Sequence, residues 1–426
     1  MVNRKIAPKI KDAIDYTLEL KPCQKFLLDN NVPVYTIDAG AEDVLQLELV
    51  FHAGNWYESA NLLAATTNHL LKNGTASRTA FAINEHFEYY GSYLNRNCYS
   101  ETATINLHSL TRHLNELLPM IREVITTSVF PQEELDIYRQ NMKQKLAVNL
   151  SKCDFIANRL IDEYLYGFEH PYGRYSSEAA YNALHREQLE SYFRDYYVNG
   201  HCVIFVGGKL PTDIIAQLNK NFGDLPLNRN AIPVAEHKII PAADHKYRIS
   251  NDSKGVQGAI RIASDFPNRH HPDFTKAQVL NTVFGGYFGS RLSGNIREDK
   301  GYTYGIYSYL QNHVQRSAWM ISTEAGTEVC EATISEVYKE MERLRNEPVG
   351  DEELLLVKNY LIGTLLGDLD GPFHIIGRWK SILLNGLSDD YFNESVATIK
   401  GITSEEIQTL ANKYLQPEKF YELVVV

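Results

Sequence analysis

The chain has 426 residues, of which 44% are hydrophobic and 22% are charged, and its formal net charge is −11 at pH 7. This length predicts more than one domain, and the apolar content excludes a globally disordered chain. The negative charge argues against a nucleic-acid-binding protein, which needs a basic surface. No apolar run is long enough for a membrane-spanning helix, so we expect no membrane partner.

Five cysteines are scattered along the chain without a CxxC pair. Their odd number and wide spacing argue against a disulfide framework and against a zinc cluster. We therefore expect reduced thiols and a cytoplasmic location. The N-terminal stretch agrees, because it carries basic residues but lacks the apolar segment of a secretory signal, although a processed precursor would show the same pattern.

The first half of the chain combines strand and helix patterns. Apolar residues alternate, as they do in strands, at 32–37, 44–51, 93–110 and 201–206. They recur at helical spacing over 62–75, 80–90, 114–129, 132–164 (with a break near residue 153) and 187–197. In the first of these helices, we expect Asn61 to cap the N-terminus and Gly74 to follow the last turn.

Residues 223–245 carry three prolines and mixed charges without a regular period, which is typical of a linker. Regular patterns return after it. Strands are expected at 258–262, 302–310, 318–323 and 420–426. Helices are expected at 273–284, 291–297, 329–346, 352–366 and 403–414.

The second half of the chain repeats the first. DYYVNGHCVIFVGG in the first half is echoed by NKYLQPEKFYELVVV at the end, and FPQEELDIYRQNMKQKL is echoed by VGDEELLLVKNYLIGTL. The offset of about 220 residues is too long for a solenoid repeat and fits a duplicated α+β domain. We therefore predict one domain at 1–222, a linker at 223–245 and a second domain at 246–426.

A zinc peptidase can place two histidines four residues apart on one helix, next to a Glu that acts as general base. The stretch LLAATTNHLLKNGT resembles the inverted zinc motif (H-x-x-E-H) of the insulinase/pitrilysin (M16) family of metallopeptidases, in which an apolar run ending in K-G-T follows the motif. With one inserted residue, that ending aligns Ala65 with the first zinc histidine, Asn68 with the Glu and His69 with the second histidine.

The family's third zinc ligand is a Glu that would fall near 142–147, where this chain has MKQKLA without a carboxylate. A catalytic zinc site needs about three protein ligands. The resemblance therefore implies that this chain holds no metal and has lost the general base. We expect His69 to be a buried or capped helix histidine.

The stretch FGGYFGSRLSGNIREDKGYTY has neither a P-loop nor a GxGxxG pattern. It resembles the second-domain signature of the same family, in which a glycine-rich turn precedes S-R-L, I-R-E, a Gly and a Tyr. The resemblance implies that Arg297 and Tyr304 donate hydrogen bonds to the substrate backbone and to the developing oxyanion. Gly285 and Gly286 of the glycine-rich turn are candidates for substrate binding, and Tyr302, on the same face as Tyr304, is a weaker one. Without the resemblance, Arg297 would be expected to pair with a carboxylate and Tyr304 to pack on its strand.

Members of this family contain two related α+β domains, each a mostly antiparallel sheet with helices packed on one face, and the resemblance implies this fold for nearly the whole chain. In some heterodimeric members, one subunit carries the zinc motif and the other carries the Arg–Tyr pair. The resemblance implies a catalytically incomplete subunit of the second kind, which binds peptide substrates beside a zinc-bearing homologue. Zinc is then expected in the partner and no cofactor in this chain, and a homodimer is the other possible assembly.

Two further functions stay open. The first is a non-enzymatic structural or peptide-binding protein, like the core proteins of respiratory complexes, which are relatives of this kind. The second is an active enzyme with a different metal site at Glu85–His86 or Glu169–His170. Neither pair has a second histidine at helical spacing, which makes this function the weakest of the three.

Overall fold

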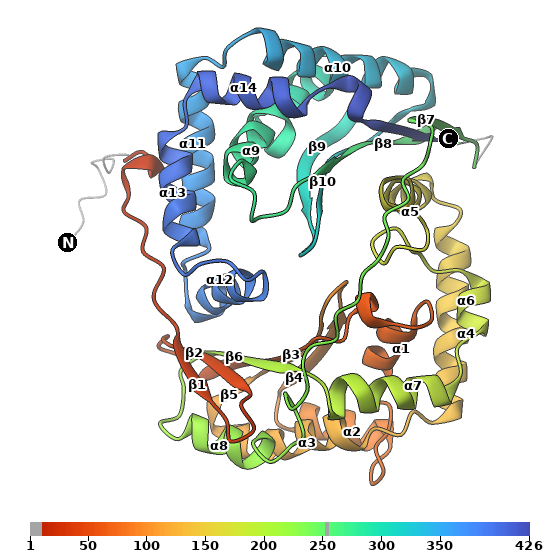
Figure 1. Cartoon of the computed structure of the whole chain (residues 1–426), viewed down its shortest axis with the longest axis vertical. Helices are drawn as coiled ribbons and strands as arrows, with labels where there is room; N and C mark the ends of the chain where they lie inside the picture. The colour runs from red at the N-terminus through yellow and green to blue at the C-terminus, as the bar shows by residue number, and fades with distance from the viewer. Residues whose placement is uncertain (1–10, 252–254) are drawn as a thin grey trace. The chain divides into compact units, whose positions relative to one another are not determined.

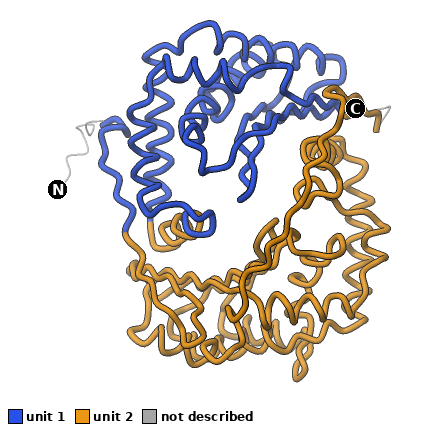
Figure 2. Tube along the Cα trace, in the orientation of Figure 1, with its two compact units in different colours: residues 1–21, 255–370, 382–424 blue, residues 22–254, 371–381, 425–426 orange. Residues whose placement is uncertain are grey.

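The computed structural model describes residues 11–251 and 255–426 (Figure 1). They form two compact units. Unit 1 contains the described parts of 1–21, 255–370 and 382–424, and unit 2 contains the described parts of 22–254, 371–381 and 425–426 (Figure 2). The predicted domain boundaries at residues 222 and 246 stay a prediction.

Unit 2 is built on a six-stranded sheet. Its strands are β1 (Gln24–Leu27), β2 (Pro33–Asp38), β3 (Val44–Phe51), β4 (Tyr93–Cys98), β5 (Ala103–Leu110) and β6 (Cys202–Gly208). Their order is β1-β2-β6-β3-β5-β4, and only the β2–β6 pair is parallel among the pairs of this sheet. The predicted strands are confirmed, whereas β1 was missed because all four of its side chains are exposed and give no alternation.

The helices of unit 2 follow the predicted order. They are α1 (Leu63–Leu70), α2 (Ala80–Tyr89), α3 (Leu114–Thr127), α4 (Gln132–Asn149), α5 (Cys153–Tyr166), α6 (Glu178–Asn182), α7 (Arg186–Phe193) and α8 (Ile214–Phe222). The expected break near residue 153 is confirmed between α4 and α5. α6 and α8 were not predicted.

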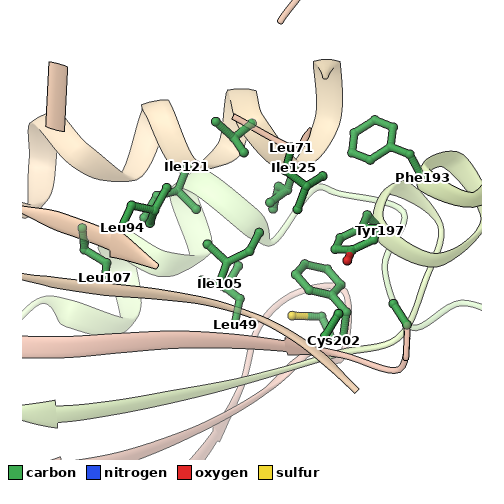
Figure 3. Close-up of a cluster of buried hydrophobic side chains, with 14 of the residues drawn as sticks. Leu49, Leu71, Leu94, Ile105, Leu107, Ile121, Ile125, Phe193, Tyr197 and Cys202 are labelled. Carbon is green, nitrogen blue, oxygen red and sulfur yellow. The ribbon is translucent and has the colours of Figure 1, made fainter. Parts of the chain in front are cut away.

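Alternate residues of β3 and β5 point toward α3 and form the core of unit 2. Leu49 and Ile105 pair across these strands and are fully buried. Ile121 and Ile125 of α3 lie over them (Figure 3). The apolar stripe of α3 at helical spacing is what made this helix predictable.

The first part of α12 (Pro372–Leu384) belongs to unit 2 and covers the opposite face of the same sheet. Glu48 alternates with the core residues of β3 and therefore points to this face, where Lys380 pairs with it at 2.7 Å. Gly207 also faces α12, because a Cβ atom there would lie 2.8 Å from Cγ2 of Ile376. No element was predicted in this part of the sequence.

Unit 1 contains most of the second, five-stranded sheet. Its strands there are β8 (Gln257–Phe266), β9 (Thr303–Asn312), β10 (Ser317–Gly326) and β11 (Tyr421–Val425), in the order β11-β8-β10-β9. β10 pairs antiparallel with both β8 and β9. The helices are α9 (Phe274–Asn281), α10 (Cys330–Asn346), α11 (Asp351–Gly367), α13 (Tyr391–Gly401) and α14 (Ser404–Tyr414). Two sheets with their own helices confirm the predicted α+β fold.

The stretch 223–245 contains no helix or strand, and it lies along unit 2. The backbone N–H groups of Ile240 and Ala242 donate to the carbonyl oxygens of Tyr166 and Tyr164, at 3.1 and 2.8 Å. A short strand, β7 (Lys246–Ile249), follows. None of the five cysteines forms a disulfide in the described part of the chain. No helix within the described residues is long and apolar enough to cross a membrane.

Candidate functional site

Helix α1 is shorter than predicted, because it begins at Leu63 and ends at Leu70. The predicted capping role of Asn61 is wrong. Its side chain instead donates a hydrogen bond to the carbonyl oxygen of Tyr175, at 2.8 Å. Gly74 has a φ of +139° and lies four residues past the helix, so it is not the residue that ends the last turn.

A buried carboxylate takes the capping role instead. Glu58 accepts hydrogen bonds from the backbone N–H groups of Leu62 (3.3 Å) and Ala64 (3.0 Å), at the helix end where an anion is favoured. Burial outweighs these contacts and the ion pair with Arg174 at 3.6 Å, and it raises the pKa of Glu58 to about 7. Sequence reasoning missed Glu58 because it precedes the helix by more than one residue, outside the usual cap position.

Asn68, which the resemblance aligns with the family's catalytic Glu, is buried within unit 2. Its amide nitrogen donates to the hydroxyl of Tyr197 at 3.1 Å and to the carbonyl oxygen of Thr104 at 3.4 Å. Ala65, at the position of the first zinc histidine, is partly exposed. The side chain of Asn68 therefore joins α1 to the sheet, and neither position supplies a metal ligand or a general base.

His69 lies in the last turn of α1 and is exposed, so the expectation of a buried histidine is wrong. Its ring packs on the ring of Tyr138 of α4, with centroids 4.7 Å apart. Arg96 of β4 donates a hydrogen bond to its carbonyl oxygen. Partial desolvation lowers the pKa of His69 to about 4, and the charges of Arg96, Lys72 and Lys145 act in the same direction.

Lys72, Arg96 and Lys145, which we call the cation cluster, stand around His69. Lys145 belongs to the stretch 142–147, near which the family's third zinc ligand would fall and which has no carboxylate. Positive charge at this place repels a divalent cation. Within 11–251 and 255–426, no group of three or more His, Cys, Asp or Glu side chains is placed to hold a metal ion. That this chain holds no zinc stays a prediction.

The second predicted site lies in unit 1, where Arg297 and Tyr304 are in contact. Arg297 belongs to the wide helical turn η6 (Ser293–Asp299), and Tyr304 lies on β9, at one edge of its sheet. Nε of Arg297 donates to the carbonyl oxygen of Tyr304 at 2.8 Å. The guanidinium carbon also lies 4.3 Å from the centre of the Phe288 ring. These two contacts hold the guanidinium beside the tyrosine.

Both alternative interpretations of this pair can be compared with the structure. Tyr304 is 93% exposed, so the hypothesis that it packs on its strand is wrong. Arg297 does pair with a carboxylate, Glu298 at 3.2 Å. Ion pairs at such exposed positions are weak, so this pair leaves Arg297 able to bind another acceptor. The roles of Arg297 and Tyr304 toward a substrate stay predictions.

The glycine-rich turn before this pair has a packing role. Gly285 lies in η5 (Thr282–Gly286), against β9. A Cβ atom at Gly285 would lie 2.6 Å from Cβ of Ser308 and 2.8 Å from Cδ1 of Leu292, distances that real Cβ atoms do not show. A Cβ atom at Gly286 would meet Asn281 at 3.1 Å. Close packing explains both glycines, and their predicted role in substrate binding stays untested.

Two further residues of this stretch make internal contacts. Arg291 forms a two-fold hydrogen bond with Glu353, with both distances 2.9 Å. Tyr302 is partly buried and donates its backbone N–H to the carbonyl oxygen of Ile296, at 3.0 Å. The signature therefore also stabilises the turn that positions Arg297.

The two other candidate metal pairs sit in ordinary structural surroundings. Nε2 of His86 lies 3.0 Å from the carbonyl oxygen of Glu116. His170 is buried, and its ring lies between the rings of Trp56 and Tyr166, at 5.6 and 5.7 Å. Neither pair is part of a group of metal-ligand side chains among the described residues.

Comparisons with known proteins bear on both sites. A family model described as "Insulinase (Peptidase family M16)" matches residues 34–170, and one described as "Peptidase M16 inactive domain" matches residues 183–361. The "Uncharacterized zinc protease YmxG" of Bacillus subtilis (strain 168) is 22% identical over 394 residues, which cover 91% of this chain and 93% of that protein. The "Non-peptidase homolog YmxG" of Helicobacter pylori is 22% identical over 326 residues, which cover 75% and 74%.

Solved structures share the fold. The structure titled as a peptidase M16 inactive domain from Pseudomonas fluorescens superposes with a TM-score of 0.84 at 24% identity, covering 95% of this chain and 98% of that chain. A protease from Helicobacter pylori superposes with a TM-score of 0.85 at 15% identity, covering 95% and 99%. At these identities the likeness concerns the arrangement of helices and strands.

Proposed function

This chain belongs to the M16 (insulinase) family of peptidases, and we propose that it is a catalytically inactive member that assists a zinc-bearing homologue. It binds peptide substrates and supplies Arg297 and Tyr304 to them, while the partner supplies zinc and the general base. The reduced cysteines suit a cytoplasmic protein. The names "inactive domain" and "non-peptidase homolog" among the similar proteins support the inactive part of this proposal.

The observation that carries the proposal is the contrast between the two sites. At the zinc-motif positions, Ala65 and Asn68 replace a ligand and the base, and His69 stands among cations. At the other site, Arg297 and Tyr304 keep the residue types and the seven-residue spacing of the family signature, and Tyr304 is fully accessible. An accessible Arg297–Tyr304 pair with the family's spacing is expected in a chain that contacts substrate, and a chain without such contact would not require it.

A guanidinium and a phenol hydroxyl can stabilise charge that develops on a carbonyl oxygen during peptide hydrolysis. Such donors are effective when they are held in place before the reaction. Phe288 and the carbonyl oxygen of Tyr304 hold the guanidinium of Arg297 in this way. In a heterodimer with a zinc-bearing homologue, these donors would stabilise the oxyanion of the peptide hydrolysis that the partner's zinc catalyses. A homodimer would bind peptides without cleaving them.

The test is peptide hydrolysis by the chain combined with a zinc-bearing M16 homologue from the same cells. Tyr304→Phe removes one hydroxyl, and we expect it to lower kcat by about 10²–10³-fold, the usual effect of losing one such donor. Tyr307→Phe is the matched control, because Tyr307 is also exposed on β9, and it should leave kcat unchanged. Arg297→Ala should lower kcat at least as much as Tyr304→Phe.

The second candidate is a structural or peptide-binding protein without a part in catalysis. The name "non-peptidase homolog" of the Helicobacter pylori relative favours it. It predicts that the complex forms and that Arg297→Ala and Tyr304→Phe leave its peptidase activity intact. That outcome would replace the first proposal.

A further inference from the structure

The three members of the cation cluster come from separate segments of unit 2. Arg96 lies on β4, at one edge of the sheet, and Lys72 lies three residues beyond His69. Lys145 lies seven residues after Tyr138 on α4, so the two share one face of that helix. The ring of Tyr138 packs on the ring of His69. Lys145 lies about two helical turns further along the same side of α4, and its charge acts on His69.

The positive charge of this cluster is not neutralised within the described part of the chain. No ion pair within 4.0 Å joins Lys72, Arg96 or Lys145 to an acid there. Nε of Arg96 is buried and has no hydrogen-bond partner among the described residues. Desolvation, and next the charge of Arg96, lower the pKa of Lys72, and the charge of Glu88 opposes this shift only in part. Uncompensated charge of this kind attracts an anion.

We propose that the cation cluster binds a carboxylate of a bound peptide, an inference that rests on the peptide-binding part of the proposed function. A carboxylate can accept charge-assisted hydrogen bonds from the two lysine ammonium groups, while the guanidinium of Arg96 adds positive charge behind them. β4 is an edge strand, and such a strand offers unpaired backbone groups to an extended peptide. The place at which the family holds a zinc ion thus becomes a site that selects peptides by negative charge.

The carboxylate can come from the C-terminus of the peptide or from an Asp or Glu side chain. Three fluorescent peptides of one sequence separate these sources: one with a Gln and an amidated C-terminus, one with the same Gln and a free C-terminus, and one with Glu and an amidated C-terminus. Their Kd values for the full chain are measured by fluorescence anisotropy. We expect at least one carboxylate peptide to bind about tenfold more tightly than the neutral one, and added salt to reduce this ratio.

Variants of the cation cluster test whether it causes the ratio between the Kd values of the neutral and the carboxylate peptides. The double variant Lys72→Gln with Lys145→Gln should bring the ratio close to one and leave the Kd of the neutral peptide unchanged. Lys143→Gln is the matched control, since it makes the same change on α4 at a lysine that bonds to Asn182, and it should keep the ratio. Equal affinity for all three peptides, or an unchanged ratio in the double variant, would overturn the inference.

A second measurement separates this inference from the proposed function. Glutarate is added to full chain carrying ¹⁵N-labelled histidine, and the ring signal of His69 is followed, with His69→Gln used to assign it. If glutarate shifts the His69 signal in the unmodified chain but not in the variant with Lys72→Gln and Lys145→Gln, the carboxylate site is supported. This holds even if no peptide binds and the peptide-binding function fails. If the peptides bind with the same affinity whatever their charge, the peptide-binding function stands and the carboxylate site is refuted. No response to glutarate and no binding of any peptide refute both.

Discussion

At the residue scale, Asn68 is a packing residue of unit 2. Its amide bonds to the hydroxyl of Tyr197 and to the sheet inside unit 2. We therefore expect that restoring the motif with Ala65→His and Asn68→Glu does not restore zinc binding. The variant still lacks a third ligand, and the cation cluster repels the ion.

Zinc content after dialysis, measured by inductively coupled plasma mass spectrometry, checks this expectation. We predict much less than one zinc per chain. The single variant Asn68→Glu should also be less stable by about 1–3 kcal/mol, because a buried hydrogen-bonded amide is replaced by a carboxylate. One tightly held zinc per chain in the double variant would show that the cluster does not prevent metal binding.

Glu58 makes the free energy of unfolding depend on pH. Its folded pKa of about 7 is above its ordinary value of 4.5, so between these values the folded state binds a proton that the unfolded state has lost. The contribution of Glu58 to the free energy of unfolding is therefore fully present below the unfolded pKa of 4.5 and is lost as pH rises through the folded pKa of about 7. Between these values the free energy of unfolding falls by up to about 1.4 kcal/mol per pH unit.

Urea unfolding of Glu58→Gln tests this sign. The Gln side chain keeps an acceptor for the helix N-terminus but cannot ionise. Relative to the unmodified chain, the variant should become more stable on going from about pH 5 to about pH 8. Glu42→Gln, at an exposed position, is the control and should show no such trend. A stability difference that stays the same across this range for Glu58→Gln would refute the assignment.

The resemblance to the family signature predicted Arg297 and Tyr304 as partners, and a helical turn followed by a strand can bring such positions together. The same information could not place Arg96 beside His69. That contact depends on how β4 packs against α1, and no local pattern encodes it. Glu58 was missed for a related reason, because its capping role depends on the left-handed conformation of Leu62, with a φ of 71°.

At the scale of elements, η5 packs closely against β9, the strand that carries Tyr304. Gly285→Ala forces a methyl group against Ser308 and Leu292. We expect a loss of about 1–3 kcal/mol in the free energy of unfolding, as is usual for overpacking, measured by urea denaturation. Gly294→Ala is the control, since a Cβ atom there meets nothing within 4 Å, and it should cost much less. Equal stability of the two variants would contradict this packing argument.

Most elements could be predicted because their apolar residues follow a helix or strand period against a single core, as in α3 and β3. The errors have physical causes. The helix predicted at 62–75 is shorter because its pattern continues into a turn after Leu70, where buried Leu71 extends the apolar stripe. α12 was missed because part of it packs on a second sheet face, a contact that only the folded unit reveals.

At the scale of the whole molecule, the internal repeat predicted two similar α+β units, and the two sheets with their helices confirm that architecture. The two candidate sites lie in different units: the positions aligned with the zinc motif in unit 2, and the Arg297–Tyr304 pair in unit 1. The repeat does not indicate which proteins the chain assembles with. Assembly depends on the surface residues that contact another protein, and the repeat does not identify these residues.

Affinity purification of the tagged chain from its native cells, with mass spectrometry and zinc analysis of the complex, tests the central claim most directly. We predict a similar-sized homologue with an intact H-x-x-E-H helix at near one-to-one ratio, and zinc that leaves with that homologue when the subunits are separated. The contrary result is a chain that holds stoichiometric zinc by itself and cleaves peptides in a chelator-sensitive way, with both properties abolished by His69→Ala.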